Sequence, residues 1–381
     1  MDVLHSCCAG LDVHKKTVVA CVRRLGPGGE VASATRTFAT TTAALLELAD
    51  WLAEMGVRHA AMESTGVYWK PVWHLLEDRF ELMLVNARHI KNVPGRKTDV
   101  KDAEWIAQLL QHGLLTPSFV PPPPVRELRD LTRQRAQLVA EKATVANRVQ
   151  KVLESANIKL GSVASDVLGA SGRAMIAGLI AGCEDAARLA GQARGRLREK
   201  DAQLRLALHG RVTEHHRFQL RQLMAQVLHL EGQIDAYGTR IAEVMAPFAA
   251  AAARLATIPG VGPRVAEGIV AEIGTDMTVF ATAGHLASWA GMCPGNDESA
   301  GKRRSGRTTK GSVWLRTLLV QAAWAASHTK ETFLARAYRK WAKRLGRKKA
   351  LVALGHKMLT VVYAMLKGGT DYSERTAPRA A

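Results

Sequence analysis

Cysteine is scarce in this chain of 381 residues, which contains five copies scattered along its length. No two of them have the C-x-x-C spacing of a zinc site or a redox pair, and Cys7 and Cys8 are directly adjacent. Because the number is odd and the spacing irregular, we expect neither a zinc site nor a disulfide framework. A reducing cytoplasm suits such a chain.

Aromatic residues and long apolar runs are also missing. Aromatics make up 5% of the chain, which disfavours a protein that grips nucleic acid mainly by stacking bases on aromatic platforms. No stretch approaches the roughly 18 consecutive apolar residues of a membrane-spanning helix, and residues 1–23 lack the basic start and apolar run of a signal peptide. We therefore expect a soluble, cytoplasmic protein with no membrane partner.

Acidic residues are few relative to basic ones. The chain has 34 Asp and Glu against 53 Lys and Arg, a net charge of +19. Hydrophobic residues reach 47%, so a sizeable core can form and wholesale disorder is excluded. Between Gly301 and Ala350, 15 basic residues accompany a single acid, Glu331. This imbalance predicts a polyanionic partner, with nucleic acid as the first candidate.

Residues 8–112 alternate between strand-like and helix-like patterns. β-Branched or apolar runs predict strands over residues 8–13, 17–22, 31–38, 58–62 and 81–85, and amphipathic spacing predicts helices over residues 42–54, 67–79 and 98–112. Three strands followed by alternating helices and strands are typical of an α/β domain, in which helices cover a mixed sheet.

Four consecutive prolines, Pro121–Pro124, end this pattern. We interpret them as a stiff, non-helical spacer at a domain boundary. From Val125 to about Ile158 the spacing predicts one long helix, in which Arg135 and Lys142 interrupt the apolar stripe. The expected domains are therefore 1–120, 121–250 and 251–381.

A second long helix follows with a cleaner pattern. Its apolar residues alternate three and four apart at Leu220, Leu223, Val227, Leu230, Ile234, Tyr237, Ile241 and Val244. A period close to 3.5 is typical of a coiled coil. The partner helix could belong to the same chain, as a hairpin packed on itself, or to a second chain, and the spacing leaves both possibilities open.

Four acidic residues of the first region are candidates for chemistry. Asp12 lies in the first apolar strand and Glu63 directly follows the fourth, where an unpaired carboxylate is costly to bury. Asp99 and Asp102 share one face at the start of a helix. Such acids suit Mg²⁺, a hard cation that prefers carboxylate oxygens. Acids in a first helical turn also favour the helix dipole without any chemistry, and all four converge only if the first and fourth strands pair.

A second candidate site is the turn Ile258-Pro259-Gly260-Val261-Gly262-Pro263 with the helix that follows it. Two glycines at a tight turn and a proline at the first helical position expose backbone N–H groups at a helix start. This arrangement resembles the helix-hairpin-helix element, which contacts nucleic-acid phosphates. A turn that only packs two helices together would use the same residues.

A third candidate is the glycine-rich, polar segment 291–311. It precedes an apolar helix over residues 312–327, with Ser312 as its N-cap, and a basic helix over residues 332–343. A serine in this segment could attack a phosphodiester while the neighbouring Lys and Arg stabilise the developing charge. No histidine lies in the segment to act as a base, so a solvated linker or a backbone phosphate contact explains the same residues.

Taken in order, these segments resemble the DEDD transposases of bacterial insertion sequences, the insertion-sequence 110 family. The matching residues are Gly-Leu-Asp12-Val-His-Lys, Met-Glu63-Ser-Thr-Gly-Val-Tyr-Trp, Lys-Thr-Asp99-Val-Lys-Asp102-Ala, and the run from Gly291 to Lys302 with Gly311-Ser-Val-Trp-Leu-Arg316. The resemblance runs from about residue 8 to residue 330. Each motif alone is weak, whereas four in order at this spacing are specific.

The resemblance implies a fold of three parts. The first is an α/β, RNase H-like domain similar to the RuvC resolvase, the second a central helical coiled coil, and the third a mainly α-helical transposase domain with a helix-hairpin-helix-like element. The four family acids map to Asp12, Glu63, Asp99 and Asp102, which would bind Mg²⁺ or Mn²⁺.

The resemblance also implies a serine nucleophile that forms a covalent phosphoserine with DNA. The matching position is Ser299, and Ser305 is the alternative because Ala300 follows Ser299 where the family motif has Ser-Gly. The expected phosphate contacts are Lys302, Arg303, Arg304, Arg307, Lys310 and Arg316.

The implied function is site-specific DNA strand cleavage and exchange that mobilises an insertion sequence. Its partners would be the DNA of the element ends and target, a structured non-coding bridge RNA that guides the reaction, and further copies of the chain as dimers and tetramers. Two alternatives remain open. One is a metal-dependent, junction-resolvase-like nuclease without a covalent intermediate, and the other is a non-catalytic coiled-coil scaffold that binds nucleic acid.

Overall fold

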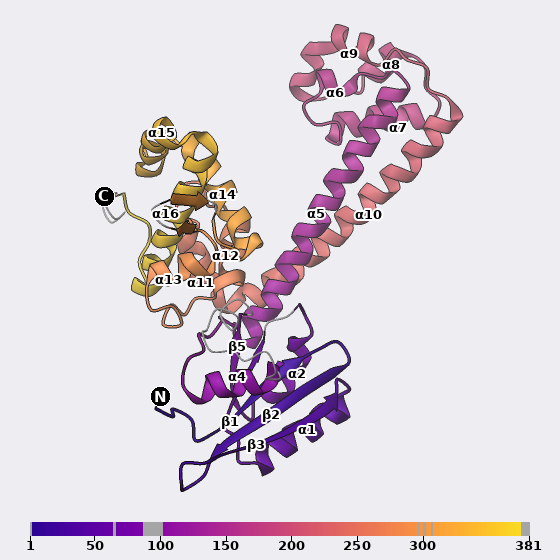
Figure 1. Ribbon diagram of the computed structural model, residues 1–381. Coiled ribbons are helices and arrows are strands. Elements are labelled where there is room, and N and C mark those ends of the chain that lie inside the picture. The colour runs from indigo at the N-terminus through magenta and orange to yellow at the C-terminus, as the bar shows by residue number, and fades with distance from the viewer. Residues whose placement is uncertain are drawn as a thin grey trace. The chain divides into compact units, whose positions relative to one another are not determined.

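The computed structural model describes residues 2–63, 66–86, 102–295, 297–299, 302–305 and 308–374, with the backbone alone described from 297 to 305. The chain forms two compact units, Met1–Val120 and Pro121–Ala381 (Figure 1). The first unit therefore ends where the proline run begins. A finer division of the second unit near residue 250 stays a prediction.

A five-stranded mixed sheet with the order β3-β2-β1-β4-β5 forms the centre of the first unit. The strands are β1 (Cys7–Val13), β2 (Thr17–Leu25), β3 (Val31–Ala39), β4 (His59–Glu63) and β5 (Glu81–Val85). Short turns join β1, β2 and β3, which are antiparallel. Helical crossovers place β4 parallel to β1 and β5 parallel to β4, as parallel pairs require. The mixed sheet expected from the sequence is confirmed.

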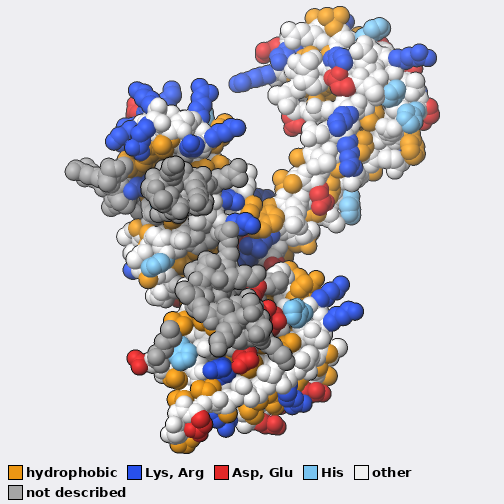
Figure 2. Space-filling model, in the orientation of Figure 1, with side chains coloured by type: hydrophobic (Ala, Val, Ile, Leu, Met, Phe, Trp, Pro, Cys, Tyr) orange, Lys and Arg blue, Asp and Glu red, His pale blue; other side chains and the backbone are white. Residues whose placement is uncertain are grey.

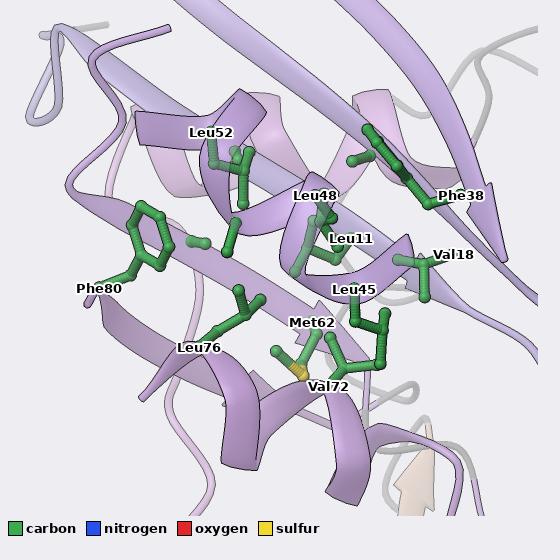
Figure 3. Close-up of a cluster of buried hydrophobic side chains, with 14 of the residues drawn as sticks. Leu11, Val18, Phe38, Leu45, Leu48, Leu52, Met62, Val72, Leu76 and Phe80 are labelled. Atoms are coloured by element: carbon green, nitrogen blue, oxygen red, sulfur yellow. The ribbon is translucent and has the colours of Figure 1, made fainter. Parts of the chain in front are cut away.

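Helices cover this sheet on both faces because successive strand residues point to opposite sides. Helices α1 (Thr42–Glu54) and α2 (Trp69–Leu76) pack over one face. Figure 3 shows the core beneath them, in which Leu45, Leu48 and Leu76 meet Leu11 and Met62 of the sheet. Helix α4 (Asp102–Gln111) covers the other face, where Trp105, Ile106 and Leu109 pack against Cys8, Ala61 and Val85.

Two long helices dominate the first part of the second unit. Helices α5 (Pro123–Ser155) and α10 (Glu214–Met245) pack against each other within the chain (Figure 1). All eight residues of the predicted α10 stripe are buried or half-buried. Within the chain, α5 is therefore a partner of α10, as in the hairpin alternative, and assembly with a second chain stays a prediction.

One expectation about this region is wrong. The proline run is not wholly non-helical, because α5 begins at Pro123 and includes Pro124. Proline is tolerated in the first helical turn, where its missing N–H would have no intrahelical partner. The charged interruptions of the α5 stripe also have a structural explanation: Arg135 pairs with Glu267 at 2.7 Å and Lys142 pairs with Glu231 at 2.8 Å.

The segment that connects α5 to α10 in the sequence forms a small helical cluster, which the sequence patterns did not reveal. It contains α6 (Leu160–Val163), α7 (Ala170–Ile180), α8 (Ala186–Ala190), the 3₁₀ helix η1 (Gly195–Lys200) and α9 (Asp201–Ala207). Ile158, Met175, Ile176, Leu179 and Leu204 form part of its own buried core. Most of these helices have only four to seven residues, too few for a helical period to show.

The remaining helices form the C-terminal part of the second unit. They are η2 (Ala246–Phe248), α11 (Ala249–Leu255), α12 (Pro263–Ile273), α13 (Ala283–Trp289), α14 (Val313–His328), α15 (Phe333–Leu345) and α16 (Arg347–Gly368). Helices α14 and α15 confirm the predicted apolar and basic helices, whereas α16 was not anticipated. Among the residues that the structure describes, α16 is the one helix long and apolar enough to cross a membrane. Because it packs against α13, α14 and α15, we interpret it as a core helix.

Candidate active site: a carboxylate group and a serine hairpin

Two of the predicted acids lie side by side on neighbouring parallel strands. Leu11 of β1 is in register with Met62 of β4, so Asp12 and Glu63 each stand one residue further along, at the carboxyl ends of their strands. Both side chains are partly accessible rather than fully buried. The pairing of the first and fourth strands, on which convergence of the acids depended, is confirmed.

Helix α4 brings a third acid to the same edge. It crosses β1 so closely that a Cβ at Gly10 would lie 2.2 Å from the carbonyl oxygen of Ala103 and 2.3 Å from the backbone nitrogen of Ala107. Only glycine allows the two backbones to meet at this distance. Asp102 begins the helix immediately before Ala103. The position of Asp102 therefore depends on a glycine that the sequence analysis did not single out.

The pKa of Asp12 responds to its burial and to the charges around it. Burial raises the pKa of Asp12 above its usual value, and the negative charges of Asp102 and Glu63 raise it further. His14 opposes the shift, since its Nε2 lies 3.1 Å from Asp12 Oδ2. Mutual repulsion of this kind is what a bound cation relieves.

The fourth predicted acid, Asp99, lies outside the described residues. Within the part of the chain that the structure does describe, no three His, Cys, Asp or Glu side chains are close enough together to hold a metal ion. The three placed carboxylates supply the hard oxygen donors that Mg²⁺ or Mn²⁺ prefers. Their chemistry fits a divalent cation, although they do not by themselves form a complete binding site.

We expect Asp12→Asn to raise the midpoint of thermal unfolding at neutral pH by a few degrees. A raised pKa means that the folded state holds this proton more tightly than the unfolded chain does. The stability that Asp12 contributes is therefore largest below its unfolded pKa, and it falls as pH rises through the folded value. The gain from Asp12→Asn should be present at pH 7 and vanish near pH 3. Calorimetry in EDTA across this range measures it, and a gain independent of pH would contradict the assignment.

The predicted serine segment is a small hairpin rather than an unstructured loop. Strand β6 (Asp297–Ser299) pairs with β7 (Lys302–Ser305). Ser299 is in register with Lys302 at one end of the strand pair, whereas Ser305 is opposite Asp297 at the other end. The two candidate serines therefore occupy opposite ends of the hairpin.

Two glycines hold the ends of this segment together. A Cβ at Gly291, which has a positive φ of 67°, would lie 2.7 Å from the nitrogen of Gly311. A Cβ at Gly311 would lie 2.3 Å from the nitrogen of Gly291. Arg316 adds a further contact at the base, because its Nη1 donates to Thr308 Oγ1 at 3.2 Å. We call this close approach of Gly291 and Gly311 the neck of the hairpin.

Other predicted contact residues of the hairpin are only partly described. Lys310 is exposed beside the neck. Arg307 lies outside the residues that the structure describes, as do the side chains of Lys302, Arg303 and Arg304 and of both candidate serines.

A buried ion cluster lies next to the neck. Glu272 of α12 is 1% exposed, and Arg133 of α5 donates to its Oε1 at 2.7 Å and to its Oε2 at 2.9 Å. Ser312, whose hydroxyl caps α14, donates to the same Oε2 at 2.9 Å. Arg129 donates to the backbone carbonyl of Ala271 at 3.2 Å, and burial lowers its pKa to about 10. This cluster ties α5, α12 and the start of α14 together.

The predicted helix-hairpin-helix turn joins α11 to α12. Gly260 has a φ of 85°, and a Cβ there would lie 2.4 Å from the carbonyl oxygen of Ala322 in α14. This glycine therefore serves close packing. Gly262 and Pro263, by contrast, are exposed, with open space around Gly262. One end of the turn is structural, and the other is accessible to a ligand.

Comparisons with known proteins agree with this arrangement. A family model of DEDD transposases of the IS110 type matches residues 9–158, and a model described as "Transposase IS116/IS110/IS902 family" matches residues 252–339. Together they cover more than half of the chain, in the order of the two units.

Several curated proteins are similar over a shorter segment. One is the protein named "Insertion element IS110 uncharacterized 43.6 kDa protein" of Streptomyces coelicolor, to which the chain is 33% identical over 128 residues. This alignment covers 32% of this chain and 30% of that protein. The chain is 30% identical over 131 residues to the pilin gene-inverting protein of Moraxella bovis, covering 32% and 39%. A putative transposase of Sinorhizobium fredii is 31% identical over 126 residues, 32% of each chain. The match spans about a third of these relatives' lengths.

Because two models of one family match residues 9–158 and 252–339 in sequence order, the chain belongs to the IS110 family of transposases.

Proposed function

We propose that this protein catalyses site-specific cleavage and exchange of DNA strands for the mobility of an insertion sequence. The observation that carries the proposal is the register of β1 and β4, which sets Asp12 beside Glu63, together with the close crossing of α4 that adds Asp102. Family membership supports the same reaction class, since the similar proteins include one named a putative transposase and one named a pilin gene-inverting protein.

The first unit would act as an RNase H-like, RuvC-like catalytic domain. Asp12, Glu63, Asp99 and Asp102 would hold Mg²⁺ or Mn²⁺, which when bound would stabilise negative charge on a phosphodiester. The pKa of Asp12 is raised first by burial and then by the charges of Asp102 and Glu63, and the second contribution supports this role because carboxylates that repel one another have affinity for a cation. The partly exposed position of these acids leaves them accessible to a nucleic-acid strand.

The second unit would supply the nucleophile. Ser299 Oγ would attack the phosphorus of a DNA phosphodiester and form a phosphoserine ester. The bond between phosphorus and one sugar oxygen breaks, and that oxygen takes up the serine proton and leaves as a hydroxyl. The position of Ser299 at the end of the strand pair away from the neck favours it over Ser305, which lies at the end near the neck. Lys302, Arg303, Arg304, Arg307, Lys310 and Arg316 would hold the phosphates around the reacting group.

Guidance by a bridge RNA and assembly of several chains complete the proposal. If RNA pairing selects the DNA sequence, the protein need recognise only backbone and shape, as in other RNA-guided systems. The low aromatic content is compatible with that division of labour. The chains would assemble as dimers, and as tetramers in the synaptic complex, so that the carboxylates of one subunit act with Ser299 of another. The reaction would take place in the cytoplasm.

A covalent trapping assay tests this function. Purified protein is mixed with Mg²⁺, the RNA transcribed from the flank of the element and labelled DNA spanning the element junction, and the products are separated on a denaturing gel with and without protease. We expect a protease-sensitive DNA adduct that is lost in Ser299→Ala, is retained in the matched Ser305→Ala and falls at least 100-fold in Asp102→Asn.

The outcomes separate the alternatives. Cut DNA without an adduct, unchanged by Ser299→Ala, would replace the serine mechanism with a metal-dependent nuclease. Nucleic-acid binding without any cleavage, unaffected by Asp102→Asn, would leave only the coiled-coil scaffold. Loss of the adduct in Ser305→Ala instead of Ser299→Ala would move the nucleophile to the other end of the hairpin.

A further inference from the structure

Helix α15 divides sharply into a basic face and an apolar face. Its five cations, Arg336, Arg339, Lys340, Lys343 and Arg344, are all exposed. At 3.6 residues per turn they fall within a sector of about 140° around the helix axis. Figure 2 shows Lys and Arg side chains gathered over this helix, whose place is marked in Figure 1.

The opposite face of α15 is used inside the protein. Leu334, Ala335 and Ala337 are buried, and Tyr338 and Trp341 are half-buried. Helix α15 packs with this face against α14 and α16. The protein core therefore explains the apolar side of α15, whereas the basic side is exposed and accessible to a binding partner.

The first turn of α16 extends the same charge. Gly346, with a φ of 77°, joins the two helices, and Arg347, Lys348 and Lys349 follow as exposed residues. We call the eight cations between residues 336 and 349 the basic corner. The sequence from 332 to 370 contains no Asp or Glu. Glu374, which lies 3.8 Å from Arg336, provides a carboxylate at one edge.

This concentration of charge opposes folding when no anion is bound. Like charges three and four residues apart on a helix destabilise it. Cations in the first turn of α16 also face the positive end of its dipole. Both costs are reversed when a polyanion neutralises the corner.

We propose that the basic corner binds the phosphodiester backbone of a nucleic acid, at a site separate from the serine hairpin. This proposal rests on the proposed function and adds a second contact surface to it. From Arg336 to Arg344 the helix rises about 12 Å, a length over which duplex DNA carries about seven phosphate charges. Five cations on one face of α15 suit that charge density, and such contacts position nucleic acid without reading its sequence.

An anionic membrane is the rival polyanion, and the packing argues against it. A helix that lies on a membrane inserts its apolar face between the lipids. The apolar face of α15 is already buried against α14 and α16. The exposed side offers charge alone, which suits a phosphate backbone better than a lipid surface.

Salt-dependent binding tests the proposal. The full-length variant Lys340→Gln/Lys343→Gln/Arg344→Gln is compared with a charge-matched control, Arg148→Gln/Lys151→Gln/Arg211→Gln, whose three residues are exposed elsewhere in the second unit. Fluorescence anisotropy measures binding of random-sequence duplex DNA and of single-stranded RNA between low and physiological salt. Flotation with phosphatidylglycerol vesicles measures membrane binding.

The corner variant should reduce the magnitude of the slope of log K against log salt by about 2.7 on duplex DNA and by about 2.1 on single-stranded RNA. A reduction confined to one of the two probes identifies the backbone that the corner binds. The control should leave both slopes unchanged. Equal slopes for the two variants would overturn the proposal, as would a loss confined to vesicle binding. The covalent trapping assay could fail while the corner variant still shows the reduced slope. That combination would contradict the proposed reaction and support the basic corner as a binding site.

Discussion

Glu272→Ala should lower the free energy of unfolding of the second unit by roughly 3–5 kcal/mol. The substitution leaves Arg133 and Arg129 without the buried carboxylate that neutralises them, and it removes the acceptor of the Ser312 hydroxyl. An arginine guanidinium carries its charge at neutral pH, so the uncompensated charge persists there. For a unit of this size the loss corresponds to a fall of roughly 6–20 °C in the midpoint of thermal unfolding.

An exposed ion pair provides the matched control. Arg240 and Glu243 are also 2.9 Å apart, but their side chains are 59% and 58% exposed. Because solvent screens exposed pairs, Glu243→Ala should change stability by less than about 1 kcal/mol. Circular dichroism melts of the two variants compare a buried with an exposed pair of similar length. Equal small losses would show that the Glu272 cluster contributes nothing beyond a surface contact.

Gly10→Ala should destabilise the first unit by about 1–3 kcal/mol or more and displace α4 from the sheet. The new methyl group would meet the backbone of Ala103 and Ala107 at distances that no side-chain rotation can relieve. Since Asp102 begins α4, its carboxylate would move away from Asp12. We therefore expect a weaker stabilisation of this variant by Mg²⁺ than of the wild type, as well as a lower melting temperature.

Gly232→Ala tests whether the loss is specific to that crossing. Gly232 lies within α10, is exposed and has open space around its Cβ position. Alanine there should leave the protein unchanged or stabilise it by up to about 1 kcal/mol, since glycine is unfavourable in a helix interior. Melting curves with and without Mg²⁺ distinguish the two positions. A Gly10→Ala protein that melts and responds to Mg²⁺ like the wild type would refute the role of Gly10.

Local patterns alone determined much of this protein. Runs of β-branched or apolar residues predicted all five strands of the sheet within a few residues, and amphipathic spacing predicted α1 at its observed bounds. The 3.5 period identified the buried stripe of α10. These features were predictable because burial of one face imposes a repeat on consecutive residues. The same patterns did not reveal the cluster between α5 and α10, whose short helices complete too few turns to show one.

Long-range packing decided what the patterns left open. Asp12 and Glu63 are 51 positions apart in the sequence, and only the parallel register of β1 and β4 places them together. The sequence contained Gly10 and Glu272, but the role of each depends on a helix that arrives from a distant part of the chain. The choice of α5 as partner of α10 was likewise undetermined by spacing, because a heptad stripe specifies an apolar face and not the chain that covers it. Local side-chain chemistry thus identified candidate residues, whereas tertiary contacts, which no local repeat encodes, determined which of them meet.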